Sequence, residues 1–257
     1  MKPGIFTLEG KSAVVIGAGG HICSAIAKGF VQSGARVAIA DLRLEKAEKV
    51  SQSLNQEYPG STLALQVDAC DKNSLEDLLE AVMEELGDVQ IAVNGAGINS
   101  PKPFLEITEF DWNEVIESQL TATMLGCQVF GAHMLANADG SIINISSASA
   151  DPALSKAFAY SAAKAGIRNL TQNLGREWGT RGVRVNAIRP GFFPTEWNRK
   201  NFITPERESA ILQHTPMKRF GEPDELIGAA IYLASAASSF VTGSELVVDG
   251  GFSAMTI

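Results

Sequence analysis

Ser12-Ala-Val-Val-Ile-Gly-Ala-Gly-Gly20 is the stretch of sequence that decides the fold. Its apolar run, Ser12–Ile16, ends directly in glycines, as a buried parallel strand does before a tight turn. After the glycines, apolar or small residues recur at helical spacing, namely Ile22, Ala25, Ile26, Gly29 and Phe30. The stretch therefore predicts a strand, a glycine turn and a helix in succession.

Strand and helix patterns alternate along the rest of the chain. Further strands are expected at Arg36–Ala40, Thr62–Val67, Val89–Val93, Ser141–Ile145, Val183–Ile188 and Glu245–Val248. Helices are expected at Leu44–Leu54, Ser74–Leu86, Asp111–Leu135, Ala157–Trp178 and Glu222–Ala234. This alternation predicts an α/β fold, a Rossmann-type doubly wound parallel sheet, in a single domain over residues 1–257. Residues 192–216 lack periodicity, and we expect an irregular substrate lid there.

The composition excludes several classes of protein. The chain has 257 residues, a net charge of −8 and a pI near 5.0, with no basic stripe of the kind that nucleic-acid binders carry. A nucleic acid is therefore not an expected partner. The chain also shows neither the apolar core of a signal peptide nor a membrane span, so a membrane is not an expected partner either. Three cysteines without paired spacing indicate reduced thiols in a cytoplasmic protein. The scattered histidines and cysteines predict no protein-bound metal.

The glycine turn and the end of the second strand indicate a dinucleotide. Gly17, Gly19 and Gly20 allow a tight turn, and the helix that follows offers N–H groups to a pyrophosphate; a glycine turn without a ligand is the alternative. Asp41 is placed to bond both ribose hydroxyls and to repel a 2′-phosphate, which predicts NAD rather than NADP. Arg43 is the nearby cation that could offset this repulsion, and Asp41 as a solvated turn carboxylate is the other interpretation.

Three polar residues form a candidate catalytic set. Tyr160 and Lys164 are four residues apart on an expected helix, so they share a face, and a neighbouring ammonium lowers a tyrosine pKa toward the range of a useful base. Ser147 directly follows an expected strand, where its hydroxyl could donate to a substrate oxygen. A surface tyrosine–lysine pair and a structural serine are the alternative interpretations.

Together these residues resemble the short-chain dehydrogenase/reductase family over essentially the whole chain. The motifs that carry the resemblance are Gly17–Ile22, Asp68, Asn94–Gly97, Asn144–Ser147, Tyr160–Lys164 and Arg184–Gly191. The resemblance implies hydride transfer between a nicotinamide and an alcohol or ketone, with Tyr160 as general acid/base and Ser147 orienting the substrate oxygen. It implies that Lys164 bonds the nicotinamide ribose and lowers the pKa of Tyr160.

The resemblance also implies the cofactor contacts and the assembly. Besides Gly17, Gly19, Gly20, Asp41, Tyr160 and Lys164, the contacts would be His21, Ile22, Asp68, Ala69, Asn94, Ala96, Gly97, Ile145, Pro190, Gly191, Phe193 and Thr195. A homotetramer is implied, with helices through Gln119–Leu135 and Ala157–Trp178 at one interface and the C-terminal strand at another.

The chain departs from the family pattern at two places. His21 and Cys23 replace glycines of the phosphate loop; Cys23 puts a side chain where helix and strand pack closely, and His21 could bond a phosphate oxygen. Gln119 replaces the asparagine of the family's catalytic set. Its longer amide could support a water relay from Lys164 or displace that water.

The substrate is inferred from the C-terminal third, which is similar to sugar-acid enzymes acting on gluconate or mannonate/fructuronate. Arg199 and Lys200 could bind a substrate carboxylate, or could be solvated lid charges. A sugar acid or polyol is therefore the leading prediction. One alternative is a 3-oxoacyl thioester reductase, which Asp41 and the polar lid disfavour. Another is an inactive dinucleotide-binding protein, which Gln119 and Cys23 favour and the intact serine–tyrosine–lysine set disfavours.

Overall fold

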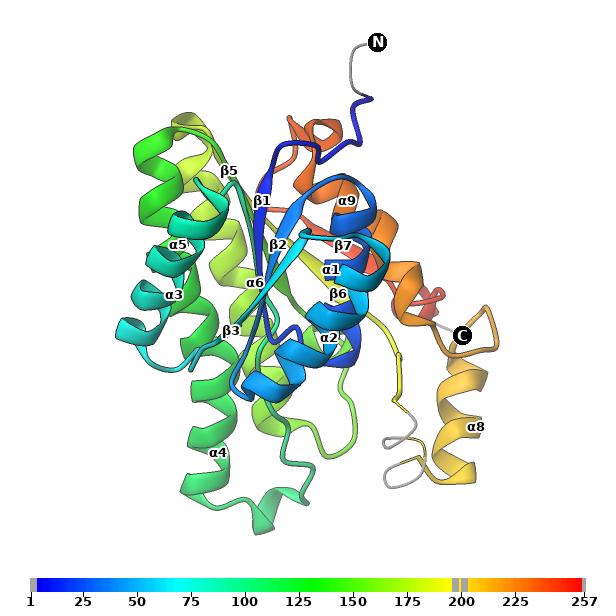
Figure 1. Cartoon of the computed structure of the whole chain (residues 1–257). Coiled ribbons are helices and arrows are strands. Elements are labelled where there is room, and N and C mark those ends of the chain that lie inside the picture. Colours follow the sequence, from blue (N-terminus) through cyan, green and yellow to red (C-terminus); the bar gives the residue numbers. More distant parts are fainter. Residues whose placement is uncertain (1–3, 196–198, 200–202, 256–257) are drawn as a thin grey trace.

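The computed structural model describes residues 4–195, 199 and 203–255. Within them, seven parallel strands form one sheet in the order β3-β2-β1-β4-β5-β6-β7 (Figure 1). The strands are β1 (Ser12–Ile16), β2 (Arg36–Asp41), β3 (Thr62–Gln66), β4 (Ile91–Asn94), β5 (Gly140–Ile145), β6 (Val183–Pro190) and β7 (Glu245–Val248). The predicted doubly wound parallel sheet is confirmed.

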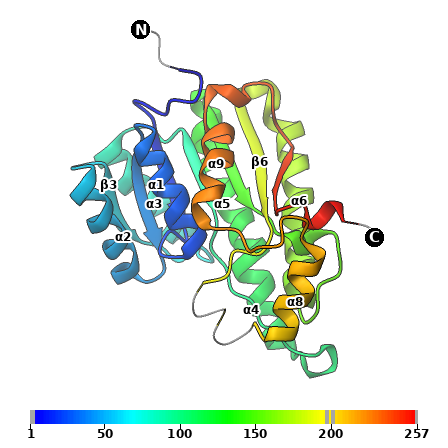
Figure 2. The ribbon, with the colours of Figure 1, turned by 90° about the vertical axis from the view of Figure 1, so that its right-hand side faces the viewer.

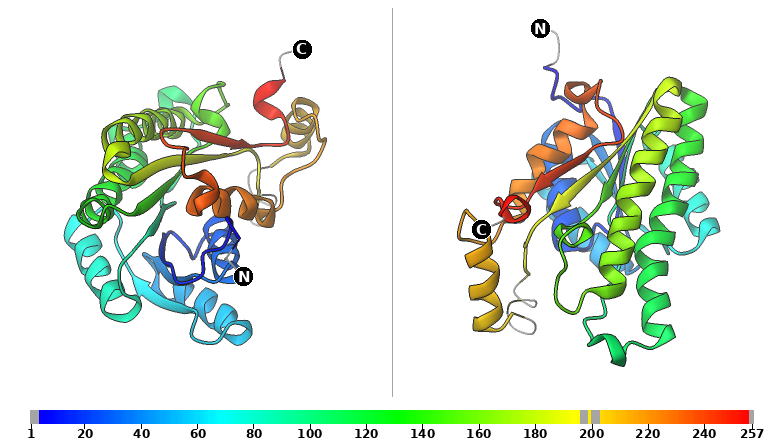
Figure 3. Two further views of the ribbon diagram at one scale, coloured as in Figure 1. Left: turned by 90° about the horizontal axis from the view of Figure 1, so that it is seen from above. Right: turned by 180° about the vertical axis from the view of Figure 1, so that it is seen from behind.

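Helices cover both faces of this sheet (Figure 3). They are α1 (His21–Gln32), α2 (Leu44–Glu57), α3 (Lys72–Leu86), α4 (Glu109–Ile116), α5 (Ala122–Asn137), α6 (Phe158–Trp178), α8 (Pro205–His214) and α9 (Ile227–Ala234). The helices α1, α2 and α9 pack on one face, and α3, α5 and α6 pack on the other. Both α4 and α8 extend past the carboxyl ends of the strands (Figure 2).

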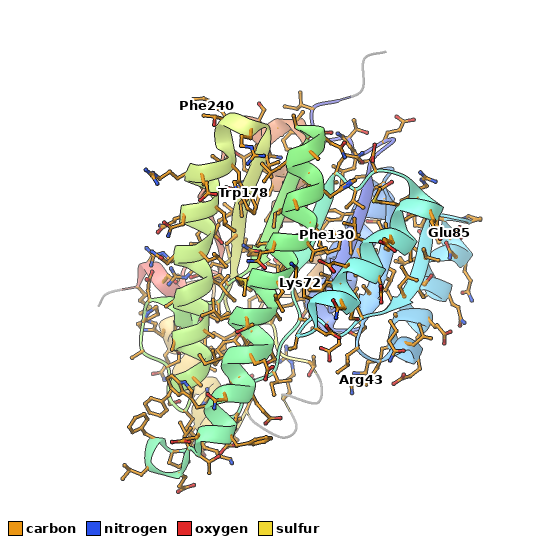
Figure 4. The ribbon with its side chains drawn as sticks, turned by 90° about the vertical axis from the view of Figure 1, so that its left-hand side faces the viewer. Arg43, Lys72, Glu85, Phe130, Trp178 and Phe240 are labelled. Atoms are coloured by element: carbon orange, nitrogen blue, oxygen red, sulfur yellow. The ribbon has the colours of Figure 1, made fainter. Side chains whose placement is uncertain are left out.

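Two apolar cores result, one on each face of the sheet. The first centres on Phe30 of α1, and the second on Phe130 of α5, beside Trp178 of α6 (Figure 4). Their central strands are buried along their whole length, which explains why the apolar runs in the sequence are continuous rather than alternating. None of the helices in the described part of the chain is long and apolar enough to cross a membrane.

Three expected elements differ in detail. The helix expected at Asp111–Leu135 starts at Glu109, ends at Asn137 and contains a π-helical turn at Glu117–Thr121. The segment expected to be wholly irregular, 192–216, contains α8, which Thr204 caps and Pro205 begins. Only Ile211 of α8 is buried, so the helix has almost no apolar periodicity to reveal it. The helix expected from Glu222 begins as a 3₁₀ turn.

The sheet register places the candidate site. Ile16 of β1 is level with Asn94 of β4, and Asn94 is level with Asn144 of β5. The strand order reverses between β1 and β4, and ligands of such sheets bind in the crevice beyond the strand ends at this point. The glycine turn, the segment after β4 and Ser147 therefore all lie at the carboxyl ends of neighbouring strands.

A buried amide network holds α6 against the centre of the sheet. Asn144 is fully buried; its Oδ1 accepts from Asn94 Nδ2 at 2.9 Å, and its Nδ2 donates to Thr171 Oγ1 at 3.0 Å. Thr171 lies on α6, the helix that carries Tyr160 and Lys164. Because buried amides are costly unless bonded, this network favours one placement of α6 on β5.

Replacing Asn144 by alanine should destabilise the fold, because the buried Asn94 Nδ2 loses its oxygen acceptor and the bond to Thr171 is removed. We expect a loss of about 2–3 kcal/mol in the free energy of unfolding, measured by denaturant titration. Ser141→Ala is the control: Ser141 lies on the same strand and makes one buried bond, to the Leu233 carbonyl, so its loss should be near 1 kcal/mol. Equal losses in the two variants would contradict a special role for the network.

Candidate active site

The glycine turn is pressed between the ends of β2 and β4. Gly17 has a φ of +80°, and its N–H and that of Ala18 donate to the Ala40 carbonyl at 2.8 and 3.0 Å. A Cβ on Gly17 would lie 2.8 Å from the Ala96 nitrogen, so only glycine fits there. Gly20 is the N-cap of α1 and has no side chain, which leaves the first N–H groups of the helix open to a phosphate.

Asp41 faces this turn from the end of β2. Its Oδ2 accepts from the Gly19 N–H at 3.0 Å, and its Oδ1 accepts from the Arg43 N–H at 3.1 Å. A Cβ on Gly19 would lie 2.7 Å from Asp41 Oδ2, so this close approach also requires glycine. The negative charge thus lies directly against the turn. His21 is exposed at the first position of α1, and Ile22 beside it is half-buried.

The structure shows how Cys23 is accommodated in place of a glycine. Its thiol is buried against Gly95, where any side chain on Gly95 would collide with the sulfur. The contact that we expected to be crowded therefore has room, because the missing side chain of Gly95 makes space for that of Cys23. Burial raises the pKa of Cys23 to about 12, so the group there is a neutral thiol.

Ser147, Tyr160 and Lys164 come together beyond the end of β5. Ser147 caps a short 3₁₀ turn, Ala148–Ala150, and its Oγ accepts from the Ser149 N–H at 3.1 Å. Lys164 is buried; its Nζ donates to the Ile145 carbonyl at 2.6 Å and lies 5.4 Å from the centre of the Tyr160 ring. The helical spacing of the pair and the strand-end position of the serine thus bring the three predicted groups to one place.

The expected effect of Lys164 on the pKa of Tyr160 stays a prediction. Burial raises the pKa of the Tyr160 phenol, and the opposing influence is a hydrogen bond with the Ser147 hydroxyl. Burial also lowers the pKa of Lys164 to about 8, which reduces the positive charge that it holds in mildly alkaline solution. The Ser147 hydroxyl is thus one group that favours the tyrosinate.

Gln119 lies in the π-helical turn and is buried. Its Nε2 donates to the Ile98 carbonyl at 2.8 Å, and its carboxamide fills the space next to the α-carbon of Gly97. Its backbone carbonyl accepts from Thr123 Oγ1 at 2.7 Å. The amide thus anchors the segment after β4, and a bond from it to Ser147, Tyr160 or Lys164 is not found in the described part of the chain.

The remaining predicted cofactor residues follow the carboxyl ends of β3, β4 and β6. Asp68 and Ala69 follow β3, and Asn94, Ala96 and Gly97 end or follow β4. Pro190 ends β6, and Gly191, Phe193 and Thr195 come after it. Asn94 turns its side chain into the buried network, so what it offers toward the site is backbone. Gly191 packs against Asp249, and the Phe193 ring lies against Gly221.

Of the two residues predicted to bind a substrate carboxylate, Arg199 and Lys200, the structure describes only Arg199. Arg199 is exposed, and its guanidinium lies 4.7 Å from the centre of the Phe220 ring. Lys200 lies outside the described residues. No group of three or more histidine, cysteine, aspartate or glutamate side chains that could hold a metal occurs within residues 4–195, 199 and 203–255.

Sequence reasoning missed two residues of the site, Gly95 and Ser149. Gly95 stands inside a quoted motif, but its role appears only with Cys23 packed against it. Ser149 donates both its N–H and its hydroxyl to Ser147 Oγ, each at 3.1 Å. A serine two residues after a candidate catalytic serine is the only signal that could have indicated it.

Comparison with known proteins agrees with this geometry. A family model described as enoyl-(acyl carrier protein) reductase matches residues 17–253, nearly the whole chain. The chain belongs to the short-chain dehydrogenase/reductase family. The resemblance found in the sequence is thereby confirmed.

Relatives within this family act on sugar alcohols and sugar acids. D-threitol dehydrogenase of Mycolicibacterium smegmatis is 38% identical over 96% of this chain and 94% of its own. The 5-keto-D-gluconate 5-reductase of Escherichia coli is 35% identical over 96% and 97% of the two chains. A crystal structure of gluconate 5-dehydrogenase from Burkholderia cenocepacia, in complex with NADP and tartrate, has a TM-score of 0.92 and 32% identity over 98% of each chain.

Replacing Lys164 by methionine should change the pH dependence of stability. The pKa of Lys164 is about 8 in the folded protein and 10.5 ordinarily, so between these values the folded state binds fewer protons than the unfolded chain. Stability that depends on this group is therefore fully present above about 10.5 and is lost as the pH falls through about 8.

We expect the free energy of unfolding of the wild type, minus that of Lys164→Met, to rise as the pH goes from 8 to 10.5. Denaturant titrations of both proteins at each pH measure this difference. A difference that stays constant across the window would show that the lysine keeps its ordinary pKa.

Proposed function

We propose that this dehydrogenase transfers a hydride between NAD and a secondary hydroxyl or ketone of a sugar acid or polyol. One observation carries the proposal: Ser147, Tyr160 and Lys164 meet beyond β5, at the same sheet edge as the glycine turn and Asp41. Gly20 at the start of α1 carries no side chain, and Gly17 and Gly19 cannot be replaced without collision. These residues fit a dinucleotide.

Each residue of the set has a defined task in this proposal. Bound nicotinamide supplies or accepts the hydride. The Tyr160 hydroxyl gives a proton to the substrate oxygen during reduction and takes it back during oxidation. The Ser147 hydroxyl donates to the same oxygen and steadies the charge that develops on it. Lys164, fixed by the Ile145 carbonyl, would bond the nicotinamide ribose, and its ammonium charge would stabilise the tyrosinate.

The preference for NAD rests on Asp41. Its carboxylate is held by two backbone N–H groups, so it cannot swing away from the position of the adenosine ribose without losing both bonds. A 2′-phosphate placed there would meet a fixed negative charge. The similar gluconate 5-dehydrogenase is in complex with NADP, and that comparison does not favour NAD. The proposed preference for NAD therefore rests on an electrostatic repulsion local to this chain.

The substrate class is supported by the relatives and by Arg199. An arginine stacked on an aromatic ring keeps the edge of its guanidinium available, and that edge matches a carboxylate. The names of the relatives indicate sugar acids and polyols rather than acyl thioesters. The alternative of an inactive dinucleotide-binding protein was favoured by Cys23 and Gln119. Cys23 no longer supports it, because Gly95 makes room for the Cys23 side chain.

The lid, the compartment and the assembly complete the proposal. Residues 192–216, including α8, would cover the substrate, and the free thiols fit a cytoplasmic protein.

We expect a homotetramer. Val247 on the edge strand β7 is partly exposed. Phe240, in the loop before β7, is fully exposed (Figure 4). These apolar side chains suit burial against a second copy. Light scattering should give the tetramer mass, and a monomer at micromolar concentration would contradict this expectation.

Replacing Tyr160 by phenylalanine should abolish turnover, because it removes the proton that the substrate oxygen exchanges. Formation of reduced cofactor with a panel of sugar acids and polyols is the measurement, and we expect a loss of at least about 100-fold. Titration of the variant with NADH is the control and should give wild-type affinity. If the variant loses both NADH binding and its folded structure, Tyr160 is a structural residue instead.

Replacing Asp41 by asparagine should shift the cofactor ratio toward NADP. Asparagine keeps an oxygen for the Gly19 N–H and removes the charge, so the turn stays ordered while the repulsion of a 2′-phosphate disappears. We expect weaker NAD binding, stronger NADP binding and a change of about tenfold or more in the ratio of their kcat/KM values. Asp41→Ala removes both the negative charge and the bond that the side chain accepts from the Gly19 N–H. An unchanged ratio in both variants would refute the role of Asp41.

A further inference from the structure

Four charged side chains form a cluster beside the candidate active site, on the α6 side of β6 and β7. Arg189 of β6 is almost fully buried; its Nη1 donates to Asp151 Oδ2 at 2.5 Å and to Glu245 Oε2 at 3.3 Å. Arg168 of α6 also bonds Asp151, and its Nε lies 3.7 Å from Glu245 Oε2. Two cations and two anions therefore balance, and the Asp151 carboxylate lies between the two arginines.

A buried ion cluster of this kind often stabilises a fold no more than a well-packed apolar pair would. Within the described residues, Arg189 Nε and Nη2 and Glu245 Oε1 are buried without a hydrogen-bond partner, so the guanidinium is not fully satisfied by its neighbours there. The cluster therefore suits a positioning role, and the connections that it makes support one.

The cluster joins the three segments that carry the proposed chemistry. Ser147 and Asp151 cap the two ends of one 3₁₀ turn, so a bond that fixes Asp151 also fixes the turn below Ser147. Arg168 follows Tyr160 and Lys164 at the same spacing of four on α6, on the same face of that helix. Arg189 directly precedes Pro190 and Gly191, the proposed wall of the nicotinamide site.

We propose that Asp151 is a positioning residue that sets the distance between the Ser147 and Tyr160 hydroxyls by clamping the turn after β5 to α6 and β6. It touches neither substrate nor cofactor; it acts through the two arginines. The placement of Ser147 relative to Tyr160 depends on this clamp, because the two residues lie on the segments that Asp151 holds together.

The charge of Asp151 is available over the whole working range of pH. The bond from Arg189 holds the pKa of the Asp151 carboxyl below its ordinary value, so the carboxylate stays ionised in neutral and mildly acidic solution. Neutralising it leaves both arginines facing only Glu245. Arg189 is buried and cannot turn to water, so we expect the turn after β5 to move instead.

The test compares Asp151→Asn, Asp151→Glu and Asp139→Asn. Asp139 forms an exposed ion pair with Lys11 at 2.9 Å near the amino end of the sheet, so Asp139→Asn is a matched control for losing one aspartate. Three quantities are measured for each protein: kcat and KM with NAD and a sugar acid or polyol, the melting temperature, and the ultraviolet absorbance of tyrosinate during alkaline titration without cofactor. Tyr160→Phe identifies the signal of Tyr160 among the three tyrosines.

For Asp151→Asn we expect kcat to fall about tenfold or more, since small misplacements of reacting groups have effects of this size. The Tyr160 titration should move to higher pH, because the bond from Ser147 that lowers its pKa is loosened. Asp151→Glu should restore part of both effects, and Asp139→Asn should change neither. If Asp151→Asn does not fold, Arg168→Gln, which leaves the Asp151–Arg189 pair intact, should show smaller changes in the same direction.

Asp151→Asn with a lower melting temperature but wild-type kcat, KM and tyrosine titration would overturn the proposal and make the cluster purely structural. The kinetic arm rests on the proposed function, whereas the titration does not. If wild-type protein turns over none of the substrates, the proposed function fails. The titration of Tyr160 then decides the clamp by itself: a shift in Asp151→Asn supports it, and no shift overturns it.

Discussion

The arrangement of the site depends on one buried contact, the bond from Lys164 Nζ to the Ile145 carbonyl at 2.6 Å. Burial of an ammonium is unfavourable and lowers the pKa of Lys164 to about 8, and the packing of α6 on β5 has to outweigh that cost. The Asn144–Thr171 bond holds the same helix to the same strand. Once α6 is placed, Ser147 lies two residues beyond Ile145 and Tyr160 lies one helical turn before Lys164, so the positions of both hydroxyls follow.

The sheet could be predicted from the sequence because its central strands, such as β1 and β5, are buried on both faces and therefore appear as largely apolar runs. The helix α8 could not, because it buries only Ile211 and its evidence is local: a threonine cap, a proline and two acids in the first turn. The π-helical turn at Glu117–Thr121 could not be predicted either, because its residues, Glu-Ser-Gln-Leu-Thr, contain no glycine or proline that would mark a break in the helix.

For the site, what depends on spacing along the chain was predictable and what depends on contacts between segments was not. Tyr160 and Lys164 share a helix face, and Ser147 ends a strand, so each could be found from its own neighbourhood. The room that Gly95 makes for Cys23, the influence of Ser147 on the pKa of Tyr160 and the burial of Arg189 between Asp151 and Glu245 join residues far apart in sequence. A single sequence carries no mark of such pairs.

The central claim is that a hydride passes between the cofactor and a carbon of the substrate at the Ser147–Tyr160 pair. The most direct test uses reduced NAD carrying deuterium at the transferring position, with keto sugar acids and ketoses as acceptors and mass spectrometry of the products. The account predicts one deuterium on the new carbinol carbon of a product, and none with Tyr160→Phe. Product without deuterium, or equal labelling with Tyr160→Phe, would contradict it.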